Sequence, residues 1–224
     1  MTAPLKQFGE ADWYETDLPP ILRPQRPRPL RALAILVLVL FSGALIGISS
    51  AYFIIERERP LMAVKIGPWE TYPDAGTADA DPYSVAIYTR GAKIPLASGE
   101  GVELIARTDS AGNKLLPMCR YRIHGQTPTA RLWTLTATNS SGRLVETLPG
   151  RSDLTSRQLL REPDGSFEIT ASTTPQPGNW LPLAAAPFTT EGLLFNLRLY
   201  DAPVSTGSAL KGVTMPAIDL VDCL

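Results

Sequence analysis

The chain has 224 residues and a formal net charge of -1, from 21 basic and 22 acidic residues. This near-balance excludes a generally basic nucleic-acid-binding protein, and a hydrophobic content of 44% excludes a wholly disordered chain. His124 is the single histidine, which excludes a zinc site built from several histidines. Proline occurs 21 times, about twice its usual share, and argues against a mainly helical fold.

The first segment, residues 1–31, is predicted to be a disordered cytoplasmic tail. It is rich in proline, which breaks helices and favours extended polyproline II chain. Its four arginines are Arg23, Arg26, Arg28 and Arg31. We expect this basic stretch to lie against anionic lipid headgroups.

The next segment, Ala32 to Ile55, contains no charged residue over 24 positions. As a helix it would be about 36 Å long, enough to cross about 30 Å of hydrocarbon with some tilt. A buried core helix and a cleaved signal peptide are the alternatives. The run is longer than a signal-peptide core and begins after about thirty residues of polar and proline-rich chain, so the sequence predicts an uncleaved signal anchor, residues 32–55.

Arginine bias gives this anchor a direction. Four arginines precede the span, whereas Arg57 and Arg59 follow it, interleaved with Glu56 and Glu58. The positive-inside rule therefore predicts a single-pass protein of the bacterial inner membrane, with a cytoplasmic N-terminus and a periplasmic C-terminal domain.

Small residues recur within the span at Gly43, Gly47 and Ala51, four positions apart. Such spacing lets two membrane helices approach closely, which predicts a helix-packing site in a homo-oligomer or with a partner. The alternative is that glycine is simply common in membrane helices.

Residues 60–224 are predicted to form a mainly β domain. Asp81 and Pro82 signal the start of a short helix, as N-cap and first helical residue. Short runs split by turn signals follow, and their spacing predicts an antiparallel β-sandwich or jelly-roll-like fold. In chain order we expect a helix at Pro82–Arg90, strands at Val102–Arg107, Arg120–His124, Arg131–Thr138 and Arg143–Glu146, a small helix at Leu154–Leu160, a strand at Phe167–Ser172, a loop with a turn at Thr173–Pro187 and a strand at Leu193–Tyr200.

Both cysteines, Cys119 and Cys223, fall in this domain. In an oxidising compartment this placement favours a disulfide that closes a loop of just over 100 residues. The alternative is a buried free thiol at Cys119 and a loose one at Cys223.

Several sequence blocks, in this order, resemble the DUF1214 family. They are Gly67-Pro68-Trp69-Glu70, Asp81-Pro82-Tyr83, Cys119-x-Tyr121-x-Ile123-x-Gly125, Ala130 to Leu135, Asp164-Gly165-Ser166, Asn179-Trp180-Leu181-Pro182 and Arg198-Leu199-Tyr200. The resemblance covers roughly residues 64–220 and implies a β jelly-roll-like domain. Members of this family often occur beside or fused to a DUF1254 domain, which implies a separately encoded DUF1254-type partner. The family's activity is not established, so the resemblance implies a fold and no reaction.

Catalytic and metal-binding patterns are weak in this sequence. A Ser-His-acid hydrolase would have to use His124, but the sequence contains no G-x-S-x-G motif to supply the nucleophilic serine. No pair of carboxylates stands out for glycosidase chemistry. Asp74, Asp79 and Asp81 lack the spacing of a calcium loop. We therefore predict no metal site and no cofactor, lean against an enzyme, and assign no catalytic residue.

A ligand-binding role is predicted for Asn179, Trp180, Arg198 and Tyr200. Tryptophan stacks on the apolar faces of sugars, and asparagine and arginine supply fixed donors. The alternative is that Trp180 fills the core, as Trp133 is expected to, and that Arg198 pairs with a carboxylate. The leading hypothesis is a domain that binds a partner protein or an envelope glycan. The alternatives are an envelope saccharide- or lipid-modifying hydrolase and a structural subunit of a membrane complex.

Overall fold

The computed structural model describes residues 29–57, 63–72, 74–91, 93–144, 151–184, 192–203, 210 and 212–223. The chain divides into two compact units, Met1–Ser50 and Ala51–Leu224. Each is described by itself below. The predicted tail, residues 1–31, lies outside the described residues except for its last three positions.

The long helix α1 runs over Pro29–Glu56 and contains the predicted span. Proline suits its first position because the first amide of a helix has no partner within the helix. With 28 residues, a hydropathy of 2.6 and no buried residue, α1 is long and apolar enough to cross a membrane. It is therefore compatible with a single-pass anchor or with a signal sequence near the N-terminus.

The rest of the described chain is mainly β, as predicted. Its one described helix is α2, Pro82–Arg90, in the predicted bounds. Asp81 caps this helix, since its carboxylate accepts a hydrogen bond of 3.0 Å from the Ser84 amide. The strands are β1 (Val64–Ile66), β2 (Trp69–Thr71), β3 (Gly101–Ala106), β4 (Cys119–Gly125), β5 (Leu132–Asn139), β6 (Asp153–Thr155), β7 (Phe167–Ser172), β8 (Asn179–Pro182), β9 (Leu193–Tyr200) and β10 (Ala217–Cys223).

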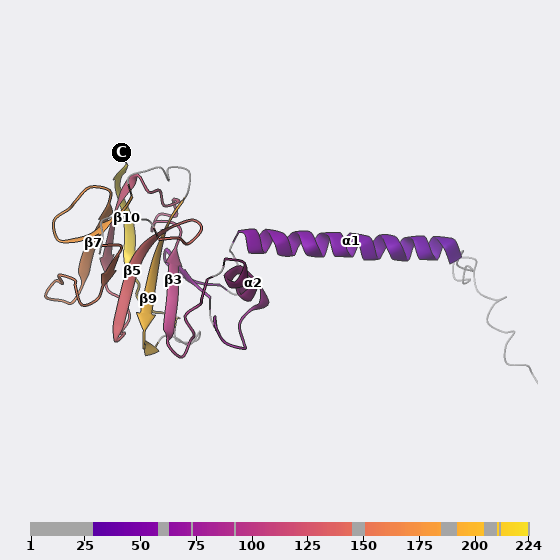
Figure 1. The fold of residues 1–224 in the computed structure, drawn as a ribbon, viewed down its shortest axis with the longest axis horizontal. Helices are drawn as coiled ribbons and strands as arrows, with labels where there is room; N and C mark the ends of the chain where they lie inside the picture. The colour runs from indigo at the N-terminus through magenta and orange to yellow at the C-terminus, as the bar shows by residue number, and fades with distance from the viewer. Residues whose placement is uncertain are drawn as a thin grey trace, which may run out of the picture. The chain divides into compact units, whose positions relative to one another are not determined.

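These strands form two sheets. The six-stranded sheet has the order β1-β2-β3-β9-β5-β6, and the four-stranded sheet has the order β10-β4-β7-β8. In Figure 1, β5, β9 and β3 run side by side in one layer, and α2 lies to the right of β3 in this view. Neighbouring strands are antiparallel as predicted, except that β7 and β8 are parallel.

The two sheets pack face to face, which makes the domain a sandwich. Alternation drives this packing: along β5, Trp133, Leu135 and Ala137 are buried, whereas the threonines between them are half-buried. Aromatic pairs join the sheets, with Trp133 of β5 5.2 Å from Phe167 of β7 between ring centroids. The core residues therefore come from both inner faces, as the strand pattern predicted.

A smaller apolar cluster lies on the outer face of the six-stranded sheet. Tyr88 of α2 and Tyr72 pack there with Ile105 of β3 and Leu194 of β9. The two tyrosine rings meet edge to face, 6.0 Å apart. The helix and the segment before it thus cover part of a face that would otherwise meet water.

The predicted small helix at Leu154–Leu160 is wrong. Its first residues form the edge strand β6, where Leu154 is paired with Leu135 of β5. Ser156 then holds the chain to β5, because its amide donates to the Trp133 carbonyl at 2.9 Å and its hydroxyl accepts from the Trp133 amide at 3.2 Å. Pairing with a sheet edge satisfies these backbone groups and outweighs a weak local helix signal.

The predicted loop at Thr173–Pro187 is wrong where it contains β8. Residues 179–182 pair with β7, and Leu181 of β8 is fully buried. Burial of this apolar pair of side chains, Trp180 and Leu181, overrides the turn-forming residues around it. Residues 185–187 of this predicted loop lie outside the described residues.

The predicted strand Arg143–Glu146 is described only for its first two residues. Of these, Leu144 forms an isolated β-bridge to Thr138.

The predicted disulfide is confirmed. Cys119 and Cys223 are bonded, with their Cα atoms 4.0 Å apart and 104 positions apart in the sequence. They occupy paired positions on β4 and β10. Strand β10, which the sequence analysis did not predict, is thereby held at the edge of the four-stranded sheet.

Candidate functional site

The four residues predicted to bind a ligand lie on different sheets. Asn179 and Trp180 belong to β8 in the four-stranded sheet, whereas Arg198 and Tyr200 belong to β9 in the six-stranded sheet. The structure brings each pair together but does not bring the two pairs into one site.

Asn179 and Trp180 line a groove of about 460 Å³, the edge groove, between the edge strands β6 and β8. Asn179 fixes one wall of it, since its side-chain amide donates to the carbonyls of Leu160 at 2.8 Å and Glu168 at 2.9 Å. Its oxygen accepts from the Leu160 amide. Asn179 therefore joins the loop after β6, at Leu160, to strand β7, at Glu168. The edge groove is lined by Arg151, Asp153, Leu154, Gln158, Leu160, Gly178, Asn179 and Trp180.

Trp180 is only 9% exposed, and its indole N–H donates to both the carbonyl and the hydroxyl of Ser172 at 3.1 Å. Trp133 is 2% exposed and lies in the main core. Both rings are therefore buried in the domain. For Trp180 this agrees with the alternative named in the sequence analysis, that its ring fills the core.

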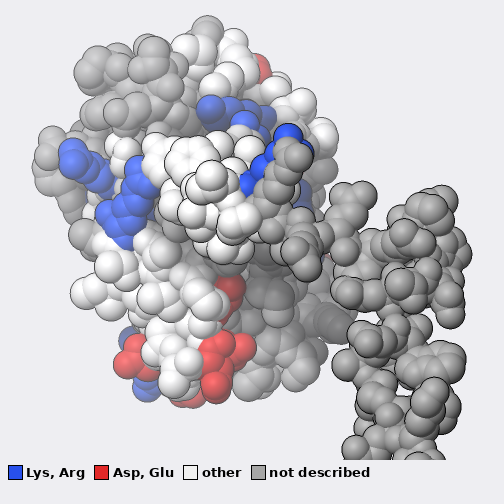
Figure 2. Space-filling model, turned by 90° about the vertical axis from the view of Figure 1, so that its right-hand side faces the viewer, with Lys and Arg blue, Asp and Glu red and all other residues white. Residues whose placement is uncertain are grey.

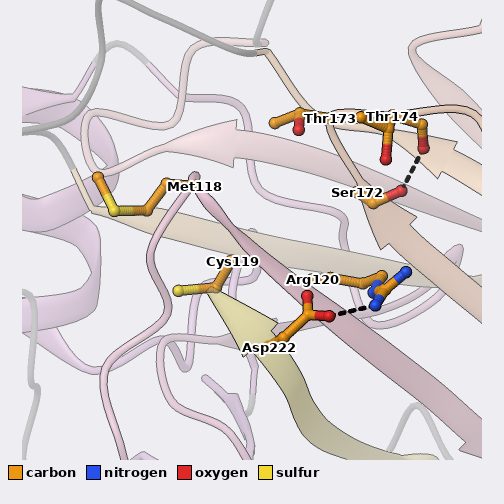
Figure 3. A pocket seen from close by; sticks show the side chains of 7 residues that line it. All are labelled: Met118, Cys119, Arg120, Ser172, Thr173, Thr174 and Asp222. Carbon is orange, nitrogen blue, oxygen red and sulfur yellow. Dashed lines mark hydrogen bonds and ion pairs between the residues drawn. The ribbon is translucent and has the colours of Figure 1, made fainter. Parts of the chain in front are cut away.

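A smaller cavity, of about 100 Å³, lies next to the disulfide (Figure 3). Its charged groups are already engaged, since Arg120 forms an ion pair with Asp222. The Ser172 hydroxyl donates to the Thr174 carbonyl at 2.6 Å. This cavity offers little room and few unengaged groups for a ligand.

The most elaborate cavity lies on the outer face of the six-stranded sheet, beside α2, and holds about 300 Å³. We call it the sheet-face pocket. Its walls combine charged, hydroxyl and aromatic groups with a few apolar side chains. It is lined by Tyr72, Ile87, Tyr88, Lys93, Glu103, Ile105, Arg107, Thr136, Thr138, Gly142, Leu144, Leu194, Asn196 and Arg198.

Strand register explains why these side chains meet. Residues two apart on a strand share a face, and paired residues on neighbouring strands stand side by side. Glu103 of β3 pairs with Arg198 of β9, and in the next row Asn196 of β9 lies between Ile105 and Thr136. The pocket floor is thus a set of cross-strand rows.

The central ion pair of the pocket joins Glu103 and Arg198. The guanidinium Nε and Nη2 atoms both lie 2.9 Å from the Glu103 Oε1 atom, and the Glu103 side chain is only 10% exposed. Burial alone would lower the pKa of Arg198, but the charge of Glu103 and the neighbouring Tyr200 raise it above its ordinary value. Arg198 pairs with a carboxylate, as the alternative to ligand binding foresaw, and it still lines the pocket.

Tyr88 extends this pair towards α2. Its hydroxyl donates to the second Glu103 oxygen at 3.4 Å. Burial, with the nearby Glu103 charge, raises the pKa of Tyr88 far above its ordinary value, so the hydroxyl stays a donor at physiological pH. Clustered titratable groups with shifted pKa values in a concave site are typical of functional sites.

Further polar groups surround this centre. Arg107 donates to the Tyr72 hydroxyl at 3.3 Å and lies 3.7 Å from the Glu70 carboxylate. Asn196 donates to the Thr138 hydroxyl at 2.7 Å. The pocket therefore presents fixed donors and acceptors on its floor and along one wall.

The predicted helix-packing residues lie on α1. A Cβ atom added at Gly43 or Gly47 would meet no atom within 4 Å. This side of the helix is open within the described chain, so the packing role stays a prediction. Among the described residues, no three His, Cys, Asp or Glu side chains are placed to hold a metal ion.

Sequence reasoning identified Arg198 but missed most of the pocket. Glu103, Asn196 and Tyr88 are not among the residues that the sequence analysis predicts to form a site. The available signal was the polar residues Asn196 and Arg198, two apart in an otherwise apolar strand. Because residues two apart on a strand share a face, this pair predicts that the outer face of the strand is polar at this point.

Comparisons with known proteins support the fold. No curated protein matches this sequence. The crystal structure of the VPA0106 protein from Vibrio parahaemolyticus is similar, with 20% identity and a TM-score of 0.53, over 80% of this chain and 43% of that one. A putative uncharacterized protein from Burkholderia cenocepacia has 23% identity and a TM-score of 0.38, over 55% of this chain and 30% of that one. The chain thus spans less than half the length of either protein.

The family comparison agrees with the resemblance found in the sequence. Residues 100–204 match the model described as a protein of unknown function, DUF1214. This range includes β3, β5 and β9, which form the floor of the sheet-face pocket, whereas Tyr88 and Lys93 precede it. This part of the chain is therefore similar to the DUF1214 family.

Proposed function

We propose that this chain is a single-pass inner-membrane protein whose periplasmic β-sandwich binds an envelope glycan in the sheet-face pocket. The apolar helix α1 supports the anchor, and the arginine bias around it supports a cytoplasmic N-terminus. The Cys119–Cys223 disulfide supports an oxidising compartment such as the periplasm.

The chemistry of the sheet-face pocket is the observation that carries the proposal. Sugar hydroxyls both donate and accept hydrogen bonds, so a sugar site needs both kinds of group held in fixed positions. Glu103 supplies an acceptor, Arg198 a fork of donors, and Thr136 a hydroxyl that can do either. The rings of Tyr72 and Tyr88 are buried against each other, so they shape the wall of the pocket beside Glu103 and offer no face for stacking.

Binding is favoured over hydrolysis by the arrangement of charge. Glycoside hydrolysis needs two carboxylates, about 5 to 9 Å apart, on either side of the scissile bond. Among the described residues that line the pocket, Glu103 is the single carboxylate, and Arg198 neutralises it. A pocket of this kind can hold a sugar but lacks the acid and base pair.

A membrane partner is compatible with this function and would add to it. A second helix packed against Gly43, Gly47 and Ala51 would give a homo-oligomer or a complex with a DUF1254-type protein. The four-residue spacing of these small side chains supports such a contact.

The test is a binding screen with the full-length protein in nanodiscs. Cell-envelope oligosaccharides are screened by saturation-transfer NMR, and hits are measured by titration calorimetry. Thr136→Phe should abolish binding because the ring would fill the pocket beside Asn196. The control is Thr170→Phe, the same change at a half-buried position of the four-stranded sheet, which should bind normally.

Two results would contradict the proposal. One is that no envelope glycan binds the wild-type protein although it is folded. The other is that Thr136→Phe binds as well as Thr170→Phe, which would place the glycan elsewhere on the molecule.

A further inference from the structure

The last turn of α1 is joined to α2. Tyr52 and Glu56 belong, like the β domain, to the second compact unit, Ala51–Leu224. Arg90, the last residue of α2, forms an ion pair of 2.5 Å with the Glu56 carboxylate. Its guanidinium carbon also lies 5.6 Å from the centroid of the Tyr52 ring. An ion pair and a cation–π contact thus hold the end of α2 beside the end of α1.

The position of Glu56 in the chain sets the depth of this contact in a membrane. The apolar span ends at Ile55, so in the proposed anchor Glu56 lies at the outer boundary of the hydrocarbon core. Each headgroup region is only about 5 to 8 Å thick, because about 30 Å of hydrocarbon lies within a bilayer of about 40 to 45 Å. A helix about 10 Å in diameter that is held against Glu56 therefore meets the headgroups.

Apolar side chains are exposed on α2 and shortly after it. Val85 of α2 is 48% exposed and Ile94 is 87% exposed, whereas Tyr88 of the same helix is buried against the sheet. Beside Val85 lies a hollow of about 250 Å³, which is lined mostly by small and apolar residues that include Ala80 and Pro95. Exposed apolar surface next to charged and aromatic residues is typical of segments that lie in a membrane interface.

Charge by itself gives a less specific indication of a partner. Figure 2 shows a face of the molecule on which most lysine and arginine side chains lie in the upper part and most acidic side chains in the lower part, with uncharged surface between them. The described residues of that face thus present both signs of charge. Attraction of one sign of ligand over the whole face is therefore not expected.

We infer that the outer surface of α2 docks on the surface of the lipid bilayer that α1 spans. The inference rests on the membrane anchor in the proposed function and adds an orientation of the β domain. Val85 and Ile94 enter the headgroup layer, and Arg90 holds α2 there through Glu56. The sheet-face pocket, whose wall includes Tyr88 of α2, then lies next to the membrane.

The test measures the depth of fluorescent labels on the full-length protein in lipid vesicles. A single cysteine is introduced by Val85→Cys, Ile94→Cys, Leu160→Cys or Ile46→Cys and labelled, since the native cysteines are bonded to each other. A lipid that carries a nitroxide just below its headgroup serves as the quencher. Labels at positions 85 and 94 should lose most of their fluorescence. The label at Leu160, which is 70% exposed and follows the edge strand β6, should keep its fluorescence.

A second pair of variants tests the link through Arg90. Arg90→Gln removes the charge that pairs with Glu56, so the label at position 85 should regain much of its fluorescence. Arg131→Gln is the matched control, because it removes the same charge from another exposed ion pair, with Asp201, outside α2. This control should leave the quenching unchanged.

The outcomes separate this inference from the anchor on which it rests. If the label at Ile46 is quenched by a nitroxide near the bilayer centre but those at positions 85 and 94 are not quenched, the anchor stands and the docking is wrong. If the label at Ile46 is not quenched either, α1 does not lie in the bilayer and the anchor is wrong as well. If Arg90→Gln leaves the label at position 85 fully quenched, Arg90 does not hold α2 at the membrane and the inference is overturned.

Discussion

Removal of the disulfide should destabilise the β domain strongly. The bond joins residues 104 positions apart, so its loss frees a long loop in the unfolded chain. The chain-entropy relation gives about 4.8 kcal/mol for a loop of this length at 25 °C. This is a large part of the 5 to 15 kcal/mol, roughly, that stabilises an ordinary domain.

The magnitude is best measured by chemical denaturation of the full-length protein in detergent. Three buried tryptophans, Trp69, Trp133 and Trp180, report the transition by fluorescence. With a urea m-value of about 2 kcal/mol/M, the midpoint should fall by about 2.4 M. The double variant Cys119→Ala/Cys223→Ala and the wild-type protein reduced with a phosphine should agree, because both open the same loop.

One result would refute this reasoning. If both reduced forms lose less than about 1 kcal/mol, unfolded-state entropy does not govern the bond's contribution. Hydrogen exchange then shows where the difference lies. In the chain-entropy account the native state is unchanged by reduction, so the Ile218 amide of β10, which donates to Ser110 Oγ at 2.8 Å, should lose protection only to the same extent as amides of the other core strands.

Three further changes have definite expected outcomes. Gly101→Ala should destabilise the domain by about 3 kcal/mol or more in thermal melts, because its Cβ would lie 2.0 Å from the Leu199 carbonyl oxygen. The raised pKa of Tyr88 means that its contribution to stability is complete below about pH 10 and is lost as the pH rises beyond that. Tyr88→Phe should therefore flatten the alkaline fall in denaturation midpoint, and an equally steep fall would contradict the assignment. Gly43→Ile/Gly47→Ile should leave the circular dichroism of the β domain unchanged but abolish cross-linking of any helix-mediated oligomer; an intact oligomer would locate the contact elsewhere.

Much of the fold could be predicted because alternation and capping are local signals. The strand Leu193–Tyr200 and the strand Phe167–Ser172 have the predicted bounds, and Asp81 caps the predicted helix. Strand β8 could not be predicted, since its pairing with β7 depends on where the sandwich core lies and its surroundings are rich in turn residues. The prediction is wrong at β6 for a similar reason. The local sequence favours a helix weakly, but pairing with the edge of β5 makes this segment a strand.

The candidate site was harder to predict than the fold. Arg198 was identified, but its partner Glu103 lies 95 positions earlier and comes beside it only through the register of β3 and β9. Tyr88 reaches the same carboxylate from a helix that packs on the sheet. The stacking role of Trp180 was predicted from its residue type and its neighbour Asn179. The burial of its ring, which places it in the core, can be seen only in the structure.

The order in which the chain is made has a consequence for β4. Its neighbours in the sheet are β7, which follows soon after, and β10, which begins about a hundred residues later. At about 5 to 20 residues per second, the 104 residues between the two cysteines take roughly 5 to 20 s to synthesise. Throughout that interval the Cys119 thiol has no intramolecular partner, and one edge of β4 is open. During this period the Cys119 thiol can be oxidised by another molecule before the Cys119–Cys223 disulfide can form. The arrival of β10 supplies both Cys223 for the thiol and a pairing partner for the open edge of β4.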